Sequence, residues 1–162
     1  MSREIMFRSW NENEKRMYRV VGLLWGRDDH DVLDELFLVD EINTLRHVDG
    51  NDTIHNNYQL TQYTGLKDLG AHQIYEGDIV YDYEHKLKLI VKWRDGKGRH
   101  FGAQVGWILD DGYYVLELKS LAESNECECA KVDVLGNIYE HPDILKSVGS
   151  FGYNPLTEEP PK

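Results

Sequence analysis

Apolar and polar residues alternate over much of this chain, and the alternation predicts β-strands. The clearest segment is 86–93, where Leu87, Leu89, Val91 and Trp93 fall on one face and the lysines on the other. Asp95-Gly96 then signals a hairpin turn. Further strands are expected at 101–109, 113–118 and 132–139. Strands at intervals of about 8–12 residues predict a mainly β fold, either a small SH3-like barrel or a strongly bent sheet.

The pattern before residue 59 predicts a separate N-terminal β subdomain. Segments 5–10 and 17–25 are expected to pair as a β-hairpin extension. An acidic connecting segment follows, and the apolar spacing of 32–39 fits a helix as well as a buried strand. Residues 46–58 are polar and rich in turn formers, which favours a boundary there. The expected domains are 1–58, a barrel-like core with its closing strand at 59–148, and a flexible tail at 149–162. One or two short helices complete this expectation, one of them starting at Pro142.

The composition is that of a folded protein, with 41% hydrophobic and 11% aromatic residues in 162. No apolar run approaches the ~20 residues that a membrane-spanning helix needs. The amino terminus lacks the apolar stretch of a secretory signal. We therefore expect a cytosolic protein with no membrane partner.

The net charge of −11 disfavours binding to nucleic acids and to anionic membranes, because both need Lys and Arg to displace counterions. One local exception is a basic ribbon of Lys86, Lys88, Lys92, Arg94, Lys97 and Arg99. Tyr81, Tyr83 and Trp93 lie nearby, and cations with stacking rings are typical of single-strand binding. The competing interpretation is a solvated outer strand whose lysines block edge pairing.

A second cluster, Glu76-Gly77-Asp78, has two possible interpretations. The two carboxylates could bind a cation or act as acid and base. The structural interpretation, which we favour, is a turn motif of Gly65, Gly77 and Asp78. Gly77 adopts a backbone angle that other residues avoid, and Asp78 accepts backbone hydrogen bonds.

Other candidate chemistry is weaker. The acidic run Asp28-Asp29-His30-Asp31 and the pair Cys127 and Cys129 each offer an incomplete set of metal ligands. The seven histidines form no recognisable pair with a nucleophile along the sequence. We therefore assign no catalytic residue, no metal site and no cofactor.

Four separated motifs resemble the YopX family of bacteriophage and prophage proteins. They are REIMFR at 3–8 with Trp10 following, LTQYTGLKD at 60–68, IYEGDIV at 74–80 and GNIYEHP at 136–142. They occur in order over nearly the whole chain. The turn at 69–73 departs from the Asn-Gly turn usual in the family. The resemblance implies a mainly β fold and a phage or prophage origin, and it brings no established activity or catalytic residue.

These observations lead to one functional expectation and two alternatives. We expect a non-enzymatic accessory protein that binds another macromolecule, with an unknown host or phage protein as its partner. The first alternative is a nucleic-acid-binding small barrel that uses the basic ribbon. The second, less favoured, is a small metal-dependent enzyme. Because Tyr and Trp are abundant, homo-oligomer formation is a further option.

Overall fold

The computed structural model describes residues 4–26, 33–96, 105–112, 115–118 and 130–146. The chain forms two compact units, Met1–Tyr63 (unit 1) and Thr64–Lys162 (unit 2). Their boundary falls after Tyr63, in the middle of strand β5 (Tyr58–Lys67), whereas the sequence analysis placed it after residue 58, the first of this strand. The expected tail at 149–162 lies outside the described residues. The fold is mainly β, as predicted, with two antiparallel sheets.

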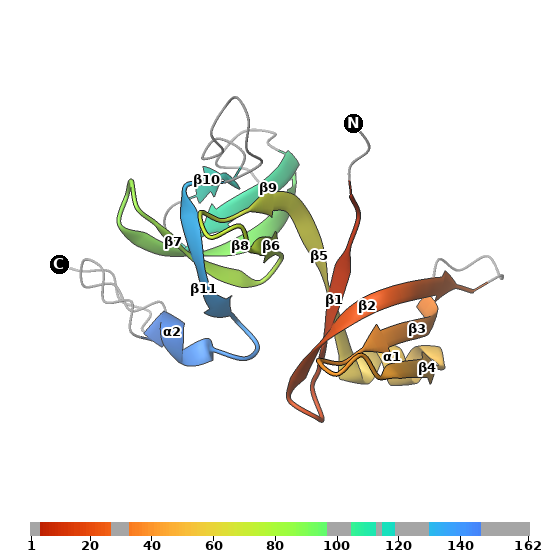
Figure 1. Ribbon diagram of the computed structural model, residues 1–162. Helices are drawn as coiled ribbons and strands as arrows, with labels where there is room; N and C mark the ends of the chain where they lie inside the picture. The colour runs from red at the N-terminus through yellow and green to blue at the C-terminus, as the bar shows by residue number, and fades with distance from the viewer. Residues whose placement is uncertain (1–3, 27–32, 97–104, 113–114, 119–129, 147–162) are drawn as a thin grey trace. The chain divides into compact units, whose positions relative to one another are not determined.

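Unit 1 contains β1 (Phe7–Asn11), β2 (Arg16–Trp25), β3 (Leu33–Val39), β4 (Leu45–Asp49), helix α1 (Asn51–Asn57) and the first part of β5 (Figure 1). Their order in the sheet is β4-β3-β2-β1-β5. The predicted hairpin of β1 and β2 is confirmed, with Ser9 opposite Tyr18. The segment that fitted helix or strand is strand β3, because it pairs with β2 on one side and β4 on the other.

The polar segment 46–58, for which the sequence analysis expected only a boundary, contains regular structure. This segment holds most of β4, all of α1 and the start of β5. Its hydrophobic pattern is faint because few of its side chains enter the core. The main one is Ile54 of α1, which is 2% exposed. Gly50, with φ of 86°, turns the chain from β4 into the helix.

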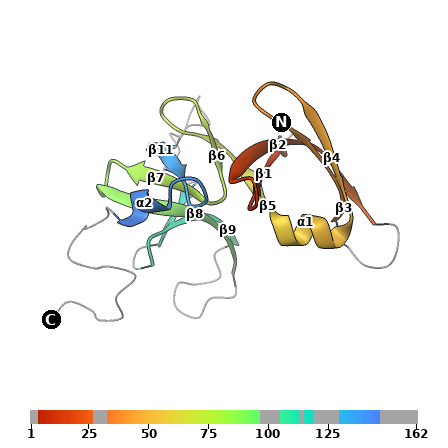
Figure 2. The same cartoon turned by 90° about the horizontal axis from the view of Figure 1, so that it is seen from below.

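Helix α1 covers one face of the unit 1 sheet, here called the inner face (Figure 2). Ile54 joins a buried cluster there with Tyr18, Leu33, Leu36 and Leu38. Residues of β2, β3 and β4 that alternate with this cluster point to the opposite, outer face.

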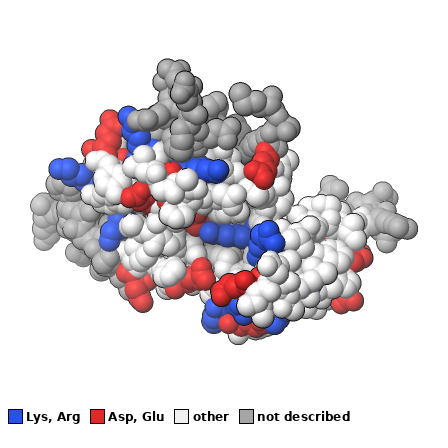
Figure 3. Space-filling model, viewed as in Figure 1, with Lys and Arg blue, Asp and Glu red and all other residues white. Residues whose placement is uncertain are grey.

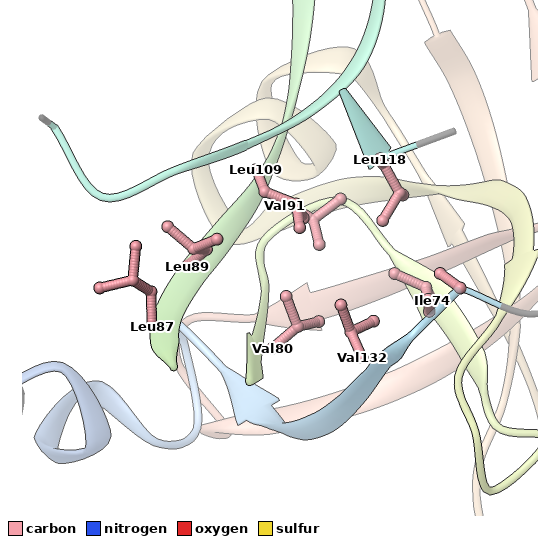
Figure 4. Close-up of a cluster of buried hydrophobic side chains, with 9 residues drawn as sticks. Ile74, Val80, Leu87, Leu89, Val91, Leu109, Leu118 and Val132 are labelled. Atoms are coloured by element: carbon pink, nitrogen blue, oxygen red, sulfur yellow. The ribbon is translucent and has the colours of Figure 1, made fainter. Parts of the chain in front are cut away.

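Unit 2 contains the end of β5, β6 (Gln73–Tyr75), β7 (Asp78–Asp82), β8 (Leu87–Asp95), β9 (Val105–Asp110), β10 (Val115–Glu117), β11 (Val132–Asn137) and helix α2 (Pro142–Lys146). β6 pairs with β5, and the other strands form a five-stranded sheet in the order β10-β9-β8-β7-β11. The nine-residue core cluster of unit 2 includes Val80, Leu89, Val91, Leu109 and Val132, whose side chains share one interior (Figure 4).

The five-stranded sheet of unit 2 is bent but open. Leu116 of β10 and Val134 of β11, from its two edges, pack against the same core, so the sheet must curl. In the part of the chain that the structure describes, β10 and β11 do not pair with each other. Of the two predicted architectures, the described strands show the bent sheet and no closed barrel. At one edge, Ala130 N, two residues before β11, donates to Lys67 O at the end of β5 at 2.7 Å.

Candidate functional site

Strand β8 positions the basic ribbon. Its alternation places Lys88, Lys92 and Arg94 opposite the face that buries Leu89 and Val91. Lys86 precedes the strand in a turn, with φ of 59°. Lys97 and Arg99, the other predicted members, lie outside the described residues. The structure therefore brings three of the six basic residues onto one face of a strand.

Acidic side chains lie close to the basic ribbon. Lys92 Nζ lies 3.0 Å from Asp110 Oδ2, on the neighbouring strand β9. Asp133 of β11 accepts a hydrogen bond from Tyr83. On the face of the molecule seen in Figure 3, basic side chains are interspersed with acidic ones over unit 2. The ribbon is thus part of a mixed surface, which weakens its attraction for a polyanion.

The aromatic candidates fall on two different faces. Tyr81 lies opposite Lys88 in the β7–β8 ladder, and its ring meets Tyr83 edge-on at 5.0 Å. Trp93 lies on the other face of β8, where it meets Trp107 of β9 edge-on at 4.9 Å. Only the two tyrosines share the lysine face.

Trp93 and Trp107 lie on the same side of the sheet as the buried residues Leu89 and Val91, but at the end of the β8–β9 hairpin, outside the buried core. Trp93 is 48% exposed and Val105, on the same hairpin, is 67% exposed. The indole N–H of Trp107 is buried and has no acceptor in the described part of the chain. The sequence analysis placed Trp93 on the apolar face of β8 and also named it as a stacking ring near the ribbon, but it did not predict how much of the ring is exposed.

Gly77 and Asp78 of the predicted turn motif lie at the start of β7, whereas Gly65 lies within strand β5 and not in a turn. Gly65 and Gly77 have φ of 88° and 79°, angles that side chains disfavour. A Cβ at Gly77 would lie 3.2 Å from the Tyr139 ring. Asp78 is 1% exposed and its Oδ2 accepts a hydrogen bond from the Tyr75 N–H at 2.8 Å. This geometry matches the turn that the sequence pattern favoured.

Two Asp–His pairs were not anticipated from the sequence. His72 Nδ1 lies 3.1 Å from Asp68 Oδ2, and His85 Nδ1 lies 2.6 Å from Asp82 Oδ2. Both carboxylates are buried while both imidazoles reach solvent. The only signal in the sequence was an Asp followed by His after three or four residues at the end of a strand.

A carboxylate that orients an imidazole is an arrangement used in general-base catalysis. Here both carboxylates also accept backbone hydrogen bonds that fix loops. Asp68 accepts from the N–H groups of His72 and Val134, and Asp82 accepts from that of Glu84. Burial alone would raise the pKa of Asp68. The hydrogen bonds from Val134 and His72 outweigh burial, and the net pKa is lowered.

The metal sites that the sequence analysis considered gain no support from the described residues. Within those residues, no group of three or more His, Cys, Asp or Glu could hold a metal ion. The Asp28–Asp31 run and the cysteines Cys127 and Cys129 lie outside them. No described helix is long and apolar enough to cross a membrane.

Comparison with known proteins gives a family but no activity. No curated protein matches the sequence. The crystal structure of protein EF1440 from Enterococcus faecalis is similar, with a TM-score of 0.53 and 26% sequence identity, over 89% of this chain and 99% of that one. The family model described as YopX protein matches residues 6–146, most of the chain. This chain therefore belongs to the YopX family.

Proposed function

We propose that this protein is a phage or prophage accessory protein that acts without catalysis, by binding another protein of the phage or its host. Membership of the YopX family supports the origin that the resemblance implied. The observation that carries the binding role is the exposed aromatic end of the β8–β9 hairpin in unit 2.

Trp93 is the centre of this surface. Leaving nearly half of an indole ring in water forgoes hydrophobic stabilisation, which a partner would supply on binding. Trp107 supports the ring edge-on from the neighbouring strand, and the exposed Val105 extends the apolar surface. Tryptophans held on rigid strands, with apolar neighbours, are typical of the residues that dominate protein–protein binding energy.

The alternative is that the bent sheet of unit 2 binds single-stranded nucleic acid. Its support is the face of β8 that carries Lys88 and Lys92, with Tyr81 opposite Lys88. Against it stand the Lys92–Asp110 ion pair and the net charge of −11. A metal-dependent enzyme has no supporting observation in the described residues.

One experiment separates the two binding roles. The purified chain is immobilised and exposed to host lysate beside two folded variants, Trp93→Ser and Leu135→Ser. Leu135 is a matched control because it is 40% exposed on β11, outside the aromatic surface. We expect the same protein to be captured by the wild type and by Leu135→Ser. The amount captured by Trp93→Ser should fall by roughly tenfold or more, as for a hot-spot residue.

Equal capture by all three proteins would contradict the proposed role of the aromatic surface. In the nucleic-acid arm, anisotropy of a labelled single strand is followed from low to high salt. Binding that weakens with salt and is lost on charge reversal of Lys88 and Lys92 would establish the alternative instead.

A further inference from the structure

The outer face of the unit 1 sheet is rich in exposed apolar side chains. Leu24 is 50% exposed, Leu45 is 62% exposed, and Val21, at a β-bulge beside them, is 50% exposed. Helix α1 covers the inner face only. In Figure 3, which views unit 1 from the side opposite α1, a broad uncharged surface occupies this face.

Gly22 and Phe37 lie opposite each other at the centre of this face. A Cβ on Gly22 would lie 3.1 Å from the Phe37 ring, so the absence of a side chain lets that ring lie over β2. Phe37 in turn stacks on His47 of β4, with ring centroids 4.7 Å apart and planes inclined by 10°. An apolar sheet face of this kind is suited to packing against a second sheet, about 10 Å away.

The charges of this face lie at opposite ends. Arg19 is exposed, lies opposite Val39 in the ladder, and has no ion-pair partner among the residues that the structure describes. Glu35 lies at the other end, opposite Leu24, and pairs with His47 at 2.8 Å. Between them lies the row of Gly22 and Phe37. A positive end, an apolar centre and a negative end form a self-complementary pattern.

We propose that this face binds a second copy of the same chain, sheet to sheet, about a two-fold axis. An axis that lies in the plane of the interface and crosses the midpoint between Arg19 and Glu35 places Arg19 of each copy against Glu35 of the other. The same rotation brings the Phe37 rings together at the centre, with the exposed leucines around them. This is an isologous interface, in which one patch serves both copies. It involves unit 1 and goes beyond the proposed function, which uses unit 2.

A dimer formed by pairing of β4 edge strands would explain the exposed apolar residues of the outer face less well. β4, the edge strand, carries Arg46, His47 and Asp49 along its five residues. Charged residues on an edge strand oppose strand-to-strand association. Arg46 is in addition held at 2.6 Å by Glu14 of its own unit. The charged edge protects against growth of the sheet, while the apolar face remains open.

The test is the mass of the full chain in solution, measured by sedimentation equilibrium over a concentration series. We expect the wild type to be a dimer. Arg19→Glu places two like-charged pairs in the interface, and so does Glu35→Arg. Each single variant should dimerise at least about tenfold more weakly. An equimolar mixture of the two variants restores both opposite-charge contacts and should form a heterodimer.

The mixture also controls for folding, because a misfolded variant could not restore association with its counterpart. The double variant in one chain should likewise recover the homodimer. A wild type that stays monomeric at all concentrations would overturn the inference. Single variants that dimerise as well as the wild type, or a mixture no more associated than its components, would do the same.

Discussion

At the scale of single residues, buried polar side chains shape the loops of unit 2. Asp68 is one of them, and its two oxygens accept three hydrogen bonds. One of these comes from the Val134 N–H at 3.1 Å and links the end of β5 to β11. The carboxylate therefore holds two segments together that lie far apart in the sequence.

The Asp68→Asn variant tests this role. Because one oxygen becomes an NH₂ group, the variant cannot accept all three bonds, and a buried N–H loses its partner. We expect the free energy of unfolding at pH 7 to fall by about 1–3 kcal/mol. Urea unfolding monitored by circular dichroism measures this change. Asp133→Asn, which changes an exposed contact with Tyr83, should cost less than about 0.5 kcal/mol.

The difference in unfolding free energy between the wild type and Asp68→Asn should depend on pH. The pKa of Asp68 is lowered in the folded state, so its ionised form stabilises the protein at pH values above the unfolded-state pKa. This stabilisation is lost as the pH falls through the folded-state pKa. The difference between wild type and Asp68→Asn should therefore shrink below about pH 4. A difference that is unchanged in acid would contradict the role given to the charge.

At the scale of elements, α1 is a helix that the hydrophobic pattern of the sequence did not predict and that tertiary packing stabilises. Its seven residues are too few for a stable helix in water. Ile54 is the member of α1 that joins the core cluster of unit 1. The periodicity of 46–58 was therefore too weak to predict, whereas the five apolar positions of 86–93 specified β8 unambiguously.

Truncating Ile54 should undock this helix. We expect Ile54→Ala to lower the free energy of unfolding of unit 1 by about 2–5 kcal/mol, because a fully buried aliphatic side chain is lost. Thr53→Ala, at the exposed neighbouring position, serves as the matched control and should change it by less than about 0.5 kcal/mol. Thermal unfolding followed by circular dichroism measures both. Equal shifts for the two variants would show that Ile54 does not anchor α1.

At the scale of the whole molecule, the residues that the structure describes form two hydrophobic clusters, one in each unit, with no shared residue. Only β5 contributes residues to both units. Core substitutions should therefore act first on the unit that contains them, since local opening follows the packing of each cluster.

Hydrogen exchange with mass spectrometry tests this separation. Ile54→Ala should accelerate exchange first in β2, β3 and α1. Leu89→Ala, at a fully buried position of unit 2, should accelerate it first in β7, β8 and β9. Uniform acceleration across both units by either variant would instead mean that the two cores unfold as one.

The sequence by itself determined the mainly β class, the opening hairpin, the strand at β8 and the turn at Gly77-Asp78. Alternating side chains and positive-φ glycines are local signals, and they act through a few neighbouring residues. Its motifs also indicated the YopX family. Tertiary structure alone decided that 33–39 is a strand, because its partners β2 and β4 fix it. It also decided that Trp93 is exposed, that Asp68 meets His72 and Val134, and that Arg19 and Glu35 lie at opposite ends of one face. These depend on where the core ends and on contacts between distant segments, which no local pattern encodes.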